Sequence, residues 1–208
     1  MRRGETPPEV VAEQMREARK QEIANVAAEA RFNWDHANHV QFLAEEAKRE
    51  PERWKTLLPE IEGQPLIDLG SGVDESIVEV AGFAKALGAS RYTAVDLHAP
   101  RLKLATTKML TKNWGEGSFV NQDMLLYLSS GEIQDDSANI MMNGMDTAIL
   151  RAGFYKANSR YLTLLVEEIA RVVGENHTVF GFWSPPVFDA LKKWGLIMTI
   201  PMAAIWKY

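Results

Sequence analysis

The chain has 208 residues, of which 46% are hydrophobic, and a formal net charge of −5. This length and composition predict one substantial core with a helical appendage, and the acidic balance argues against a general nucleic-acid binder, which normally presents a basic face. The absence of cysteine excludes disulfides, thiol catalysis and cysteine-based zinc sites.

The sequence carries no sign of a membrane or export segment. No stretch approaches the roughly 20 consecutive apolar residues that a membrane span needs. The charged start, with Arg2, Arg3 and Glu5, lacks the apolar core of a signal peptide. We therefore expect a soluble, cytoplasmic protein that does not bind membranes.

Residues 1–60 are expected to form a helical cover over the rest of the chain. Thr6-Pro-Pro-Glu9 has the pattern of a capping box, with prolines where a helix does not need a backbone N–H. Apolar residues at helical spacing follow it. Asp35 is placed to cap a second helix, which we expect Pro51 to break before a short turn.

From residue 61 to residue 208, strands and helices alternate. The expected strands are 66–69, 92–97, 118–122, 138–143 and 177–183. Helices between strands mean right-handed crossovers and a parallel sheet. The β-rich end, Leu196–Tyr208, predicts an antiparallel edge. The predicted fold is therefore α/β, with a Rossmann-like, doubly wound, mostly parallel sheet of about six or seven strands.

Glycines and acids gather where the predicted strands end. The first strand passes straight into the Gly70–Gly72 turn, which presents backbone N–H groups at the edge where α/β sheets bind nucleotide-like ligands. Asp68 lies inside that strand, Asp96 ends the second and Asp123 closes the third. Each acid alone has an ordinary alternative role as a helix cap or a solvated loop residue. Three acids at one sheet edge predict a shared crevice.

The residues after the glycine turn indicate which ligand this crevice takes. A dinucleotide-binding turn has a third glycine where this chain has Glu75, beside Asp74. Two carboxylates at a helix start would repel a diphosphate, and the P-loop signature is absent. A phosphate-free adenosine derivative with positive charge fits better. S-adenosylmethionine, with its sulfonium and ammonium groups, is such a ligand.

Three motifs resemble those of the class I S-adenosylmethionine-dependent methyltransferases. They are Leu66-Ile-Asp-Leu-Gly-Ser-Gly72, Ala94-Val-Asp-Leu97 and Asn121-Gln-Asp-Met124, in that order and on the first three strands. The resemblance covers roughly residues 64–208, which is nearly all of the predicted S-adenosylmethionine-binding methyltransferase domain, residues 61–208. The sequence departs from the family at Asp74, where the glycine loop often has its third glycine.

The resemblance implies how the first two motifs hold S-adenosylmethionine. The methionine end would be held by the first motif, through Asp68, Gly70, Ser71 and Gly72. In the second motif, Asp96 would bind the ribose and Leu97 would pack on the adenine.

The later strand ends would complete the site. Asp123 and the backbone of Met124 would meet the adenine edge. Asn143, at the end of the fourth strand, would lie near the methyl group, where it is both a cofactor-binding and a catalytic candidate.

His36 and His39 are the other catalytic candidates, because N-terminal helices of the resembling enzymes often form part of the acceptor pocket. The alternative is that Trp34 is a hydrophobic staple and both histidines lie on a solvated helix face. The two histidines are close enough to share a metal ion, but no third ligand is evident, so no metal is predicted. His98 is expected to be a loop residue near the cofactor.

The leading functional prediction is methyl transfer to a small-molecule acceptor by in-line displacement. The fourth strand ends in Asn143-Gly-Met-Asp146 and lacks the Asn/Asp-Pro-Pro-aromatic string of enzymes that methylate nucleic-acid bases. One alternative is a non-catalytic module that binds S-adenosylmethionine or a related nucleoside. A less favoured one is an NAD(P)-dependent reductase. We expect a monomer or a homodimer.

Overall fold

The computed structural model describes residues 7–29, 49–72, 74–97, 102–115, 118–142 and 156–181. These residues form a five-stranded, entirely parallel sheet in the order β3-β2-β1-β4-β5. The strands are β1 Pro65–Leu69, β2 Arg91–Asp96, β3 Phe119–Asn121, β4 Asn139–Met142 and β5 Val179–Gly181. The predicted α/β class and parallel sheet are confirmed. The further strands expected over residues 196–208 lie outside the described residues.

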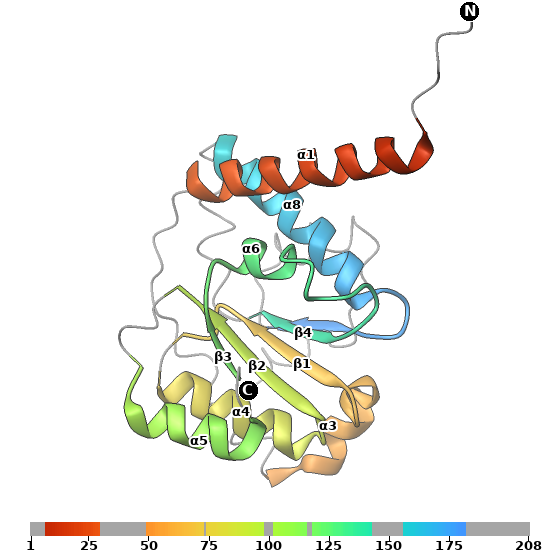
Figure 1. The fold of residues 1–208 in the computed structure, drawn as a ribbon. Helices are drawn as coiled ribbons and strands as arrows, with labels where there is room; N and C mark the ends of the chain where they lie inside the picture. The colour runs from red at the N-terminus through yellow and green to blue at the C-terminus, as the bar shows by residue number, and fades with distance from the viewer. Residues whose placement is uncertain are drawn as a thin grey trace, which may run out of the picture.

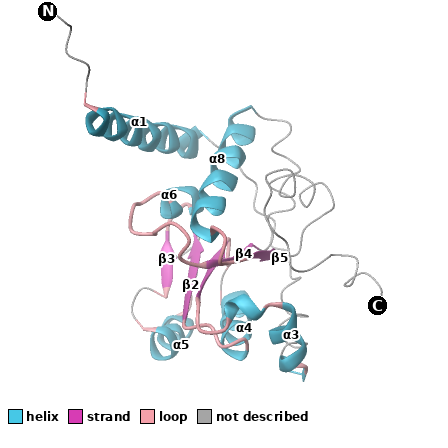
Figure 2. Ribbon diagram, turned by 90° about the vertical axis from the view of Figure 1, so that its right-hand side faces the viewer, coloured by secondary structure: helices cyan, strands magenta, loops and turns pink. Residues whose placement is uncertain are grey.

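Helices cover both faces of this sheet (Figures 1 and 2). One face carries α3 (Pro51–Leu57), α4 (Glu75–Ala86) and α5 (Leu104–Trp114). The other carries α6 (Met124–Leu128) and α8 (Lys156–Val173), with α1 (Pro8–Glu29) packed against them from outside. A short 3-10 helix, η1 (Pro59–Ile61), leads from α3 toward β1.

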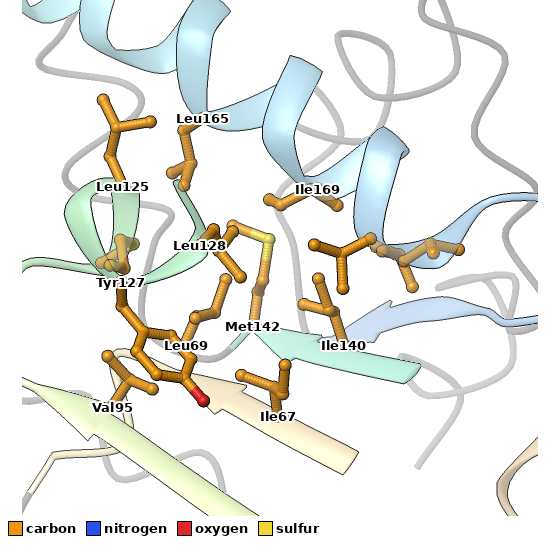
Figure 3. Close-up of a cluster of buried hydrophobic side chains, with 14 of the residues drawn as sticks. Ile67, Leu69, Val95, Leu125, Tyr127, Leu128, Ile140, Met142, Leu165 and Ile169 are labelled. Carbon is orange, nitrogen blue, oxygen red and sulfur yellow. The ribbon is translucent and has the colours of Figure 1, made fainter. Parts of the chain in front are cut away.

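Two hydrophobic clusters fill the space between these layers. Strand side chains alternate between faces, so Ile67 and Leu69 of β1 enter one cluster while Leu66 enters the other. Figure 3 shows the first cluster, in which Leu165 and Ile169 of α8 lie over the sheet. The buried positions of α8 repeat every three or four residues, as in an amphipathic helix with one face on the core.

The helix break expected before α3 is present, since Arg49 is helical and Glu50 is not. The short turn expected after Pro51 is instead a helix, α3, which Pro51 begins because proline at a first helical position loses no intrahelical hydrogen bond. The helix after β2 begins at Leu104. Among the helices of the described residues, none is long and apolar enough to cross a membrane. The helix predicted after Asp35 lies outside the described residues.

The strand order reverses direction beside β1. From β1 the chain builds outward through β2 to β3, and then crosses back to place β4 on the other side of β1. β1 is therefore the strand at which the order switches sides, with β2 on one side of it and β4 on the other. In open α/β sheets, such a switch point is where ligands bind.

Candidate functional site

The glycine turn lies at this switch point, directly after β1. Gly70 and Gly72 have φ angles of 69° and 72°, which glycine adopts without steric cost. The backbone N–H groups of Gly70 and Ser71 donate to the carbonyl oxygen of Val95, at 2.9 and 3.3 Å. These hydrogen bonds hold the turn against the end of β2. The conformation of the turn requires glycine at positions 70 and 72, because a side chain at either would cause backbone strain.

Asp96 ends β2 and contacts the glycine turn. The backbone N–H of Gly72 donates to Asp96 Oδ2 at 2.9 Å. The side-chain nitrogen of Asn121, in the amide orientation that satisfies its hydrogen bonds, donates to the carbonyl oxygens of Asp96 and Leu97, each at 3.1 Å. These hydrogen bonds join the ends of β1, β2 and β3. Leu97 follows with 47% of its surface exposed.

Asp68 lies beneath the turn and is completely buried. Its register partner on β2 is Ala94, so Tyr92, two residues earlier, lies on the same face of the sheet. The Tyr92 hydroxyl donates to Asp68 Oδ2 at 2.8 Å. The pKa of Asp68 is raised to about 7, mainly by burial and to a smaller extent by the nearby Asp96, while the Tyr92 hydrogen bond acts to lower it.

Two buried oxygens at the turn lack hydrogen-bond partners. Within the described residues, neither Asp68 Oδ1 nor the hydroxyl of Ser71 has one, although the Ser71 side chain is buried. Buried polar atoms are normally satisfied, and leaving one unpaired costs about 1–3 kcal/mol. Because one of these atoms lies in the glycine turn and the other just before it, the turn is a candidate binding site for a polar ligand.

Asp74, the departure from the resembling family, is buried and has a φ of 37°. Its Oδ1 accepts from the backbone N–H of Lys103 at 2.7 Å and from the hydroxyl of Thr106 at 2.8 Å. The Lys103 backbone hydrogen bond is the main reason that the pKa of Asp74 lies below its usual value. The Lys103 ammonium also lies 3.4 Å from Glu75, so part of the acidic charge expected to repel a diphosphate is neutralised.

Asp123 and Met124 lie at the start of α6. Asp123 caps this helix, because its Oδ1 accepts from the backbone N–H groups of Leu125 and Leu126 at 2.9 and 3.1 Å. Its Oδ2 accepts from the Tyr161 hydroxyl at 2.8 Å. Burial raises the pKa of Asp123 despite these hydrogen bonds. Met124 is buried in the cluster under α8. The ordinary role of Asp123 as a helix cap is thus present, and its contact with adenine stays a prediction.

The catalytic candidates His36, His39 and Asn143 lie outside the described residues, as does His98. His177 is described: its Nδ1 lies 3.0 Å from Asp136 Oδ1, just before β5 begins. This pair lies at the amino ends of the strands, away from the glycine turn. Within the described ranges, no group of three or more histidine and acidic side chains could hold a metal ion.

Sequence reasoning missed the partners of the acids. Tyr92, Thr106 and Tyr161 each donate a hydroxyl hydrogen bond to one of them from 24 to 38 residues away. Only the β1–β2 register and the packing of α5 and α8 bring them near. No local sequence signal marks such partners. Comparison of the chain with protein-family models, curated proteins and solved structures gave no match.

Proposed function

We propose that this chain binds S-adenosylmethionine at the carboxyl edge of its sheet and transfers the methyl group to a small-molecule acceptor. The observation that carries the proposal is the contact between Gly72 N–H and Asp96 at the switch point of the sheet. It places a glycine turn and a carboxylate side by side, as a nucleoside ligand requires. In this proposal the fold is Rossmann-like and of class I.

The charges at the site support a cationic ligand. Asp68 and Asp96 lie next to the glycine turn, and Asp68 Oδ1 is buried without a hydrogen-bond partner among the described residues. A positive group nearby would favour the ionised form of Asp68, whose pKa burial has raised to about 7. A phosphate would instead add negative charge to an acidic site.

The proposed roles follow the positions of the residues. Asp96 would accept from the ribose hydroxyls, since each carboxylate oxygen has more than one lone pair. The exposed side chain of Leu97 is available to pack on the adenine. Asp123 already accepts three hydrogen bonds, so the backbone of Met124 is the better candidate for the adenine edge.

When bound, S-adenosylmethionine supplies an electrophilic methyl group on a sulfonium, which is a good leaving group. The chain then has to align the acceptor with this methyl group and exclude water. A base is needed only where the acceptor must lose a proton. His36, His39 and Asn143 are proposed for these tasks.

Calorimetry with S-adenosylhomocysteine tests the binding step. We expect Asp96→Ala to weaken binding by roughly 10- to 100-fold, the usual consequence of stranding hydrogen-bond donors. Asp96→Asn, whose side-chain oxygen can still accept the hydrogen bond from Gly72, should lose less affinity than Asp96→Ala. Glu132→Ala removes an exposed acid from the loop before β4, at the opposite edge, and should bind normally. A folded wild-type protein that ignores the compound at millimolar concentration would refute the proposal.

Two further measurements separate the alternative functions. Binding of NADH in preference to S-adenosylhomocysteine would indicate a reductase. Transfer of a labelled methyl group from S-adenosylmethionine to any member of a metabolite panel would show an enzyme. Cofactor binding without such product across the panel would indicate a binding module.

A further inference from the structure

Asp74 has a backbone conformation that its residue type rarely adopts. Its φ of 37° and ψ of −94° fall outside the wells that L-residues normally occupy. Such a conformation costs free energy and persists only where surrounding interactions hold it. The side chain of Asp74 is buried and supplies those interactions.

The partners of Asp74 belong to a different element. Lys103 immediately precedes α5, and Thr106 lies in the first turn of that helix. A single oxygen, Oδ1, accepts from both of them, at 2.7 and 2.8 Å. The ammonium of Lys103 lies 3.7 Å from Oδ2. Asp74 therefore ties the segment after β1 to the start of α5, across the end of β2.

The same segment is fastened a second time only two residues earlier. Gly72 donates to Asp96 at the end of β2, and Asp74 accepts from the helix that follows β2. In the first contact the glycine turn donates the hydrogen bond, through Gly72. In the second contact the segment after the turn accepts it, through Asp74. Together they fix the glycine turn relative to Asp96.

We propose that Asp74 is a positioning residue: by accepting from Lys103 and Thr106, it holds Gly72 against Asp96 and so sets the affinity of the site for its adenosine ligand. This inference rests on the proposed function for the identity of the ligand. Asp74 itself does not contact the ligand.

Substitutions of Asp74 separate its side-chain hydrogen bonds from its backbone strain. Asp74→Asn keeps an oxygen acceptor and tolerates a positive φ better than most residues. Asp74→Gly removes the acceptor but relieves the strain, so this variant should stay folded. We expect Asp74→Asn to bind S-adenosylhomocysteine within about threefold of wild type, and Asp74→Gly to bind at least about tenfold more weakly.

Thr106 offers a matched pair that leaves Asp74 in place. Thr106→Ser keeps the hydroxyl and should bind as wild type does, while Thr106→Val removes one of the two donors and should bind more weakly. Thermal unfolding of each variant provides the control. A merely structural role would lower the melting temperature of the Asp74→Gly protein and leave the affinity unchanged, and that result would overturn the inference.

Hydrogen exchange at the Gly72 amide tests the inference without any ligand. This N–H is bonded to Asp96, so its protection reports how firmly the turn is held. Asp74→Gly should reduce that protection by at least about tenfold and Asp74→Asn should preserve it. Unchanged protection in Asp74→Gly would refute the positioning role. Failure of wild-type protein to bind S-adenosylhomocysteine, with this exchange difference intact, would refute only the proposed function.

Discussion

We predict that the buried carboxyl group of Asp68 makes the protein less stable as the pH rises toward neutrality. Its pKa is about 7 in the folded protein and 3.8 is the ordinary value. Between these values the folded state holds a proton that the unfolded state has lost. The free energy of unfolding therefore falls as pH rises through this window, and the loss is complete above the folded pKa. Below pH 3.8 the Asp68 carboxyl is protonated in both the folded and the unfolded state, so it does not reduce the free energy of unfolding.

The size of this effect follows from the difference between the two pKa values. Roughly three pKa units, at about 1.4 kcal/mol each, amount to roughly 4 kcal/mol for a side chain that is fully buried. Asp68→Asn removes the titration and keeps an oxygen that can accept from Tyr92. The new amide nitrogen has its own packing cost, but that cost does not change with pH.

Urea unfolding across the pH range checks this prediction. We expect the free energy of unfolding of Asp68→Asn, minus that of wild type, to rise by up to roughly 4 kcal/mol between about pH 4 and about pH 8. Glu132→Gln, an exposed carboxyl in the loop before β4, is the control and should follow wild type. A difference between Asp68→Asn and wild type that stays constant across the range would show that Asp68 does not titrate as its burial requires.

Two other substitutions test the packing of the fold. A Cβ at Gly174 would lie 2.5 Å from Asp136 Cβ. Gly174→Ala should therefore destabilise by about 1–3 kcal/mol more than Gly131→Ala, because Gly131 also has a positive φ, of 84°, but no described atom lies within 4 Å of its added Cβ. Equal melting temperatures would contradict the clash. Ile23 is the buried contact of α1, and Ile23→Ala should cost about 2–5 kcal/mol in urea unfolding. Val11→Ala, at an exposed position of the same helix, should cost less than about 0.5 kcal/mol, and equal costs would show that α1 is not docked.

Local sequence patterns determined much of the fold. The apolar run that ends at Leu69 predicts a buried strand, and the spacing of Tyr161, Leu165 and Ile169 predicts a helix with one buried face. Both patterns act over a few residues, because side chains alternate on a strand and recur every 3.6 residues on a helix. The alternation of the two element types then predicts a parallel sheet, which the structure contains.

The acids show where this reasoning reaches its limit. The sequence places Asp68, Asp96 and Asp123 near the ends of successive strands, and the structure leaves each of them in a different environment. Asp68 is buried against Tyr92, Asp96 holds the glycine turn, and Asp123 caps α6. The helix cap was foreseeable because it is local. The other two contacts each join residues 24 positions apart, and they form only because the register of β1 and β2 brings those residues together.

Asp74 shows most clearly the difference between what local sequence indicates and what tertiary contacts determine. From the sequence it was a carboxylate in place of a glycine, expected to repel phosphate. In the structure its charge is turned toward the start of α5, where Lys103 and Thr106 donate to it. The sequence alone determined which chemical groups are available and in which kind of element each one lies. Tertiary packing decided which groups meet, because hydrogen bonds between distant residues form only once the sheet and its helices fix their separation.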